Sequence, residues 1–189
     1  MKSGKGQLSA IFILIIALFM QMEGLIPNIF AGNEAPIILT NEIEGVELKA
    51  EIESKSFNNE NAIIVKVIVI NRNPQPISYY AGTTSYGVRG VIGAALSSTD
   101  GESSFTDKVD LTGKFVSNAM VLEGKLESGR ALTYDFEMLP FYMENGSVKY
   151  ISSGQYILRL WYNKAAGETI KTEFPMKIVK RFGRMYIKL

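Results

Sequence analysis

Apolar and polar side chains alternate with a two-residue period over most of the chain after residue 45. This alternation is typical of β-strands that bury one face and expose the other. It is clearest in four stretches, residues 46–52, 132–138, 155–162 and 170–178. No stretch after Phe30 repeats its apolar residues at the 3.6-residue spacing of an amphipathic helix. We therefore expect an all-β fold, an antiparallel β-sandwich of seven to nine short strands.

The segments between these strands carry further signals. Residues 62–70 form a nearly continuous β-branched run, which predicts a central strand that is covered on both faces. Turn-forming residues occupy 71–76, and extended structure resumes over 77–81. The polar composition of 97–108 predicts a loop, and 115–122 is expected to form a strand.

Residues 86–96 are ambiguous. Val88, Ile92 and Ala94 fit one face of a strand. The glycines in this stretch instead favour bends or close backbone contacts. Within the expected strand 155–162, Trp161 and Tyr162 are adjacent, so one of them must face each side of the sheet.

The 189-residue chain contains no histidine and no cysteine. Without histidine there is no Ser-His-Asp triad, no imidazole general base and no His-ligated zinc. Without cysteine there is no thiolate nucleophile, disulfide or Cys-ligated metal. The sequence also lacks a Gly-x-Ser-x-Gly elbow and a P-loop. We therefore predict that the protein is not an enzyme and that it has no catalytic residues, no metal and no cofactor.

The acidic residues fit solvated surfaces. Asp135 and Glu137 lie opposite the apolar face of their expected strand, so we expect them to face solvent. A row of glutamates is expected on the exposed side of an edge strand, where charge discourages pairing with other chains. It consists of Glu42, Glu44, Glu47, Glu51 and Glu53. Four acids within 100–110 offer calcium ligands, but they lack the EF-hand order, and a solvated loop is the preferred interpretation.

The first 31 residues have the organisation of a secretory signal peptide. Two lysines precede an uninterrupted apolar run over 10–20. A helix of that run rises only about 16 Å, roughly half of the hydrocarbon core of a bilayer. The best cleavage site lies between Ala31 and Gly32. This predicts an extracellular or cell-surface protein whose residues 32–189 form a single β-sandwich domain.

Two alternatives to a cleaved signal remain open. The hydrophobic segment could stay as an uncleaved anchor helix, which would then be the only segment expected to insert into a membrane. Alternatively, the residues around Gly6 and Gln7 resemble the class III signal peptides of archaeal pilin-like proteins, which are cut after the glycine. That resemblance implies a filament subunit with residues 7–30 as an assembly helix.

Charge is unevenly distributed along the exported part. Residues 177–189 contain five basic residues and no acid, whereas 32–176 contain 13 basic and 18 acidic residues. This basic strand or tail could contact anionic wall polymers, lipid headgroups or a partner, but the preferred interpretation is a last strand whose lysines and arginines face water. The near-neutral total argues against nucleic acid as a partner.

Several short motifs resemble the bacterial intracellular proteinase inhibitor (BsuPI) family. They are a strand over 65–71 that ends in Asn71, a leucine-x-x-glycine turn over 126–129 before an aromatic strand, and Gly154-Gln155-Tyr156 at the start of another strand. The resemblance covers roughly residues 46–162. It implies an immunoglobulin-like β-sandwich and, for the founding member, protease inhibition. It also implies that Tyr156 packs at a corner of the sandwich.

The best candidate for a recognition site is the segment 140–146. It contains Phe141, Tyr142 and Met143, and Asn145-Gly146 favours a tight turn. Exposed apolar loops are common contact surfaces, although these aromatic residues could instead cap one end of the sandwich. We therefore expect a binding module whose partner is another protein or a cell-envelope polymer, with self-association as a further possibility.

Overall fold

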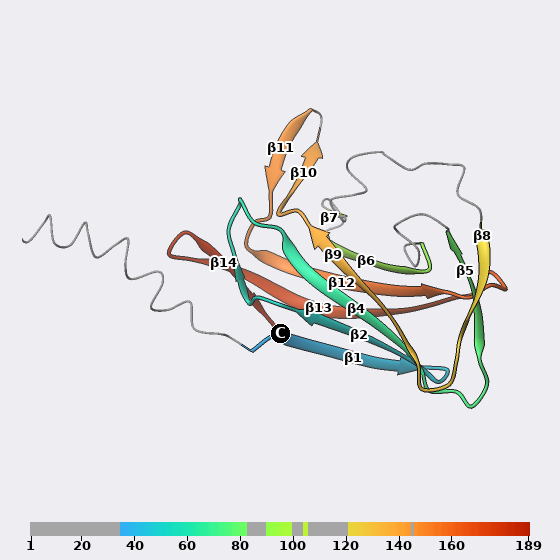
Figure 1. Ribbon diagram of the computed structural model, residues 1–189. Helices are drawn as coiled ribbons and strands as arrows, with labels where there is room; N and C mark the ends of the chain where they lie inside the picture. Colours follow the sequence, from blue (N-terminus) through green and yellow to red (C-terminus); the bar gives the residue numbers. More distant parts are fainter. Residues whose placement is uncertain (1–34, 83–89, 100–103, 106–120, 145) are drawn as a thin grey trace, which may run out of the picture. The chain divides into compact units, whose positions relative to one another are not determined.

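The computed structural model describes residues 35–82, 90–99, 104–105, 121–144 and 146–189 (Figure 1). The expected signal segment, with its cleavage positions, and the acidic stretch within 100–110 lie outside these ranges, apart from residues 104–105. Ala35–Leu189 form one compact unit, and every regular element described in it is a β-strand. The all-β prediction is therefore confirmed.

Two larger antiparallel sheets make up most of this unit (Figure 1). The four-stranded sheet has the order β1 (Ile37–Ile43), β2 (Val46–Ile52), β4 (Ile63–Asn71) and β9 (Ala131–Met138). The six-stranded sheet has the order β3 (Ser56–Phe57), β14 (Arg184–Lys188), β13 (Thr169–Arg181), β12 (Gly154–Asn163), β6 (Ile92–Ser98) and β7 (Ser104–Phe105).

Two smaller antiparallel pairs extend from these sheets. β5 (Ile77–Gly82) pairs with β8 (Val121–Leu126), and β10 (Phe141–Glu144) pairs with β11 (Ser147–Tyr150). β5 and β8 continue the chain directions of β4 and β9 beyond a bend, whereas β10 and β11 form a separate hairpin between β9 and β12.

The hydrophobic core lies between the facing sides of the two larger sheets. On β12 the inward residues Tyr156, Leu158, Leu160 and Tyr162 are all buried, as the alternation predicts. On β13, Ile170, Thr172, Met176 and Ile178 are buried in the same way. A hydrogen bond between the sheets joins the Asn41 side-chain nitrogen to Thr172 Oγ1 at 2.8 Å.

β4 differs from its expected environment. It is central in its sheet, between β2 and β9, as predicted. Its odd-numbered residues are buried, but Ile64, Lys66, Ile68 and Ile70 are only half-buried. The prediction that both faces are covered is therefore wrong, because a two-layer arrangement buries only the inner face and the outer residues are shielded only by their neighbours.

Other strand predictions need correction as well. The structure describes fourteen strands rather than seven to nine, because it adds β1, the two-residue β3 and β7, the β10–β11 hairpin and β14. The expected loop 97–108 begins inside β6, since Ser97 and Ser98 pair with β12, and it contains β7. Of the expected strand 115–122, only 121–122 are described; they belong to β8, which continues to Leu126. Of the glutamate row, Glu42 lies on the edge strand β1, but Glu47 and Glu51 lie half-buried on β2, which pairs with both β1 and β4.

Candidate interaction surface at one end of the sheets

Several loops and hairpins meet at one end of the two sheets. β2 ends there at Ile52 and leads through a short connection to β3, while β9 ends at Met138 and leads into the β10–β11 hairpin. β12 begins at the same end, where Gly154 pairs with Ile178, and β13 turns back there into β14. We call this the hairpin end.

The β10–β11 hairpin contains the recognition segment predicted from the sequence. Its register pairs Phe141 with Tyr150 and Met143 with Val148. The rings of Phe141 and Tyr150 lie edge to face with centroids 6.0 Å apart. At its base the Ile151 amide donates to the Pro140 carbonyl at 2.8 Å. The predicted aromatic segment is therefore a hairpin rather than an irregular loop.

The predicted residues are divided between the core and the surface. Tyr142 is half-buried and packs against the hydrophobic core. Gly146 lies in the turn with φ of 77°, as expected for a tight hairpin, and Asn145 lies outside the described residues. The exposed apolar side chains are instead on β11, where Val148 and Tyr150 are 47% and 50% exposed. The sequence did not lead us to predict Val148 and Tyr150 as contact residues, although they alternate with Ser147 and Lys149 as strand residues do.

Tyr156 fixes the start of β12 beneath this hairpin. Its side chain is buried, and its hydroxyl donates to the Ser152 carbonyl at 3.0 Å and accepts from the Ser152 amide at 3.3 Å. The neighbouring Ser153 hydroxyl accepts from the Lys180 amide at 3.0 Å. The base of the β10–β11 hairpin is thus attached directly to the strand that leads into the β13–β14 hairpin.

The turn between β13 and β14 has an unusual residue at its tip. Arg181 pairs with Arg184, and the two residues between them both have positive φ, 48° for Phe182 and 76° for Gly183. Two positive φ values are the pattern of a type I′ turn, which favours Asn, Asp or Gly. The Phe182 side chain is 100% exposed. The exposed position of Phe182 was not predicted, although Gly183 shortly after a strand pattern was a usable turn signal.

Basic side chains surround this tip. They are Lys177, Lys180, Arg181, Arg184 and Lys188, all exposed, and we call them the basic set. Within the described residues, no member of the basic set forms an ion pair. Other cations do find acids: Lys164 contacts Glu168 at 3.0 Å and Glu44 at 3.1 Å, and these contacts, with Glu168 first, raise its pKa.

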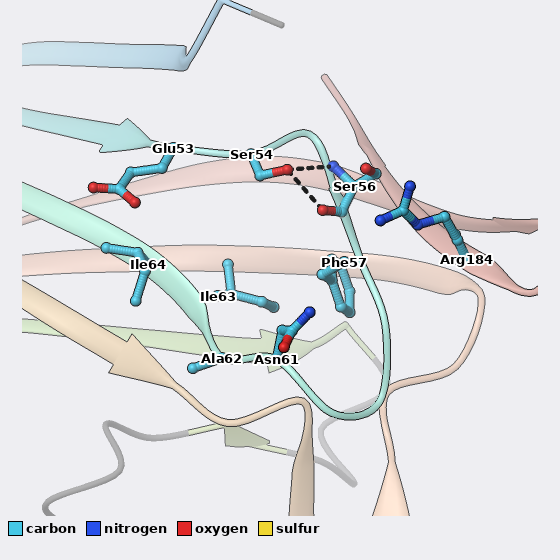
Figure 2. A pocket seen from close by; sticks show the side chains of 9 residues that line it. All are labelled: Glu53, Ser54, Ser56, Phe57, Asn61, Ala62, Ile63, Ile64 and Arg184. Carbon is cyan, nitrogen blue, oxygen red and sulfur yellow. Dashed lines mark hydrogen bonds between the residues drawn. The ribbon is translucent and has the colours of Figure 1, made fainter. Parts of the chain in front are cut away.

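A cavity of about 270 Å³ also lies at the hairpin end (Figure 2). It is lined by the connection between β2 and β4, including Phe57, by Ile63 at the start of β4 and by Arg184 of the β13–β14 hairpin. Figure 2 shows Glu53 and Arg184 on opposite sides of it. With one carboxylate in its lining, this cavity does not offer the carboxylate pair that glycoside hydrolysis uses.

The acidic side chains considered as catalytic or metal-binding candidates do not converge on one site. Asp135 and Glu137 are exposed on the outer side of β9, as predicted. Among the residues that the structure describes, no three acidic side chains gather in a way that could hold a metal ion. Over the same residues, no helix is both long enough and apolar enough to span a membrane.

One buried polar atom stands out in the core. Tyr162 is fully buried, and its hydroxyl has no hydrogen-bond partner among the described residues. Burial, with a smaller contribution from Tyr79, raises its pKa to about 12. Its neighbour Trp161 lies on the outer face of β12. Of these two adjacent aromatic residues, the tyrosine therefore faces the core.

No protein-family model matches the chain, and no curated protein matches it either.

Proposed function

We propose that this protein is an exported, non-catalytic, immunoglobulin-like β-sandwich module that binds another protein through its β10–β11 hairpin. The observation that carries the proposal is the hairpin itself. Its aromatic pair is anchored to the core through Tyr142, yet Val148 and Tyr150 remain about half exposed. Aromatic side chains held rigidly at the surface are favourable contact residues, because little conformational freedom is lost on binding.

The immunoglobulin-like classification is supported by the contacts of Tyr156. In immunoglobulin-like domains a tyrosine near the start of one strand returns its hydroxyl to backbone a few residues upstream. Tyr156 makes this contact with Ser152, four residues earlier. The two facing antiparallel sheets with a common core agree with a sandwich of this type.

Export is the part of the proposal that depends on the first 31 residues. The N-terminal sequence of the mature protein tests it directly. Gly32 as the first residue supports a cleaved secretory signal, and Met1 supports an anchored form on the cell surface. Gln7 as the first residue contradicts the secreted module and favours the pilin-like filament subunit.

The binding role is tested by photo-crosslinking from position 150 in cells that produce the protein. We expect a discrete crosslinked protein partner, and we expect the double variant Val148→Ser/Tyr150→Ser to weaken its binding at least about tenfold, as loss of a hot spot does. The matched control is Tyr80→Ser/Leu122→Ser, which removes two equally exposed apolar side chains from β5 and β8. Equal loss in both variants would contradict a hairpin-specific site.

Protease inhibition is the narrower form of the proposal and derives from the resemblance to the BsuPI family. The purified protein should then slow at least one protease in a panel that covers the main mechanistic classes. Unchanged proteolysis throughout the panel would remove inhibition and would leave the binding role to the crosslinking result.

A structural role in a surface filament is the second candidate, and the β1 edge favours it. Within the described residues β1 pairs only with β2, so its outer edge is open over seven residues. Ile38 on this strand is 54% exposed. An open apolar edge is suited to strand addition by another copy of the chain. Ile38→Lys should then abolish assembly in light scattering, and a monomeric wild-type protein would contradict this role.

A further inference from the structure

The conformation at the tip of the β13–β14 hairpin is energetically unfavourable in the folded chain. Phe182 takes a positive φ that bulky side chains rarely adopt, and its side chain contacts nothing that shields it from water. The β1–β2 hairpin provides an internal comparison. There, Glu44 and Gly45 have nearly the same φ values, 51° and 70°, but the exposed residue is a polar glutamate that reaches Lys164.

The charges around Phe182 are also unfavourable for folding. The strand register places Arg181 opposite Arg184 and Lys177 opposite Lys188. Like charges directly opposite each other destabilise a strand pair. Between these two pairs lie the half-buried Val179 and Tyr186, which are themselves opposite each other. Four members of the basic set and an aromatic side chain therefore share the outer face of this hairpin.

We propose that the β13–β14 hairpin docks on the surface of an anionic lipid bilayer, with Phe182 inserted among the lipids and the basic set against their phosphates. A bilayer offers a favourable environment to both the exposed ring and the unpaired cations. Its acyl region receives the exposed ring, and its headgroups neutralise unpaired cations. Tyr186 then lies at the headgroup level, where aromatic side chains are enriched.

The charges and the exposed ring together distinguish a bilayer from a soluble polyanion. A wall polymer could neutralise the basic set but would leave Phe182 in water.

The test is binding of the full chain to vesicles of phosphatidylcholine, with and without phosphatidylglycerol. We expect stronger binding to the anionic vesicles, and weaker binding as salt is raised. Phe182→Asn suits the positive φ and should leave the fold intact, yet it should weaken anionic-vesicle binding about tenfold. Arg181→Gln/Arg184→Gln should weaken it about twentyfold. The charge-matched control Lys125→Gln/Lys171→Gln should bind nearly as the wild type does.

A conservative variant adds a readout of insertion. Phe182→Trp should retain binding, and its additional tryptophan emission should shift to the blue on anionic vesicles, relative to wild-type protein that contains only Trp161. The proposal is overturned if Phe182→Asn binds as tightly as wild type, or if the hairpin variants and the charge-matched control lose binding equally. It is also overturned if soluble polyglycerol phosphate displaces the protein fully while Phe182→Asn has no effect, since the hairpin would then recognise a polyanion alone.

Discussion

Two buried polar residues differ in whether their hydrogen-bonding groups have partners. Asn71 is fully buried at the end of β4, where β4 and β9 bend into β5 and β8. Its side-chain nitrogen donates to the carbonyls of Gln75 and Leu126, both at 2.8 Å, and its oxygen accepts from the Asn73 amide. The Tyr162 hydroxyl, in contrast, is buried without a partner among the described residues.

Replacing Asn71 should be strongly destabilising. Asn71→Ala removes three hydrogen bonds and leaves the buried Leu126 carbonyl without its side-chain donor, which should lower the free energy of unfolding by about 3 kcal/mol. Chemical denaturation measures this change. The control is Asn58→Ala, which removes an asparagine that accepts from two backbone amides in an exposed turn. We expect a loss of less than about 1 kcal/mol there, and equal losses would contradict a special role for Asn71.

Tyr162→Phe should stabilise the protein. Removing an unpaired buried hydroxyl should raise the free energy of unfolding by about 1 kcal/mol near pH 7. Burial raises the tyrosine pKa from 10.0 to about 12. The wild-type protein therefore keeps its full stability below pH 10 and loses stability as the pH rises through about 12, because Tyr162 ionises in the unfolded chain before it ionises in the folded protein. The advantage of Tyr162→Phe should grow by about 2 kcal/mol over this interval. Parallel pH profiles for both proteins would contradict the prediction.

Strand pairing determines which glycines are structural. Gly93 on β6 lies opposite Trp161 on β12, and a Cβ on Gly93 would overlap the indole ring. Gly124 on β8 is covered in the same way by Tyr79 on β5. An aromatic ring that lies over a glycine in the neighbouring strand shields the exposed backbone and fixes the register of the pair.

The Gly93–Trp161 pair is best tested by a double-mutant cycle. Gly93→Val should displace the indole and lower the free energy of unfolding by about 2 kcal/mol. The same substitution should cost less in the Trp161→Ala background, with a coupling energy of at least about 1 kcal/mol. Gly154→Ala is the control, because its new Cβ meets only Tyr156 Cε2 at 3.5 Å. Additive effects of the two substitutions would contradict the proposed contact.

The strands that sequence analysis identified are those with one buried face. β2, β9, β12 and β13 have regular alternation, and the buried residues are the predicted ones. β1 was not identified, because its second half is exposed at consecutive positions, 40–42. β3 and β7 have two residues each, which is too short for any period to be detected. Similarly, Val148, Tyr150 and Phe182 are exposed apolar residues, and only the fold distinguishes these from core positions.

At the scale of the whole described unit, unpaired basic side chains and the exposed Phe182, Val148 and Tyr150 lie at the hairpin end. The two hairpins there are linked at their bases through Ser153 and Lys180. The opposite end holds the turns at Glu44–Gly45 and around Gly167, where Lys164 pairs with two glutamates. The sequence shows the basic residues as a C-terminal run, but only the pairing of β13 with β14 places them around one exposed aromatic tip. Within the described unit, the hairpin end therefore combines unpaired cations with exposed apolar side chains, whereas Lys164 at the opposite end is paired.

This division predicts a localised footprint on anionic vesicles. Hydrogen–deuterium exchange should slow in residues 177–188 when the protein binds, because the bilayer then excludes water from the β13–β14 hairpin. Exchange in the turn at Glu44–Gly45 should be unchanged, since that turn lies at the opposite end. The β10–β11 hairpin decides how the two proposed contacts are related. Unchanged exchange in residues 141–150 means that this hairpin stays available to a protein partner while the other holds the membrane. Slowing in both hairpins would contradict two separate contacts and would indicate a single surface formed by the whole hairpin end.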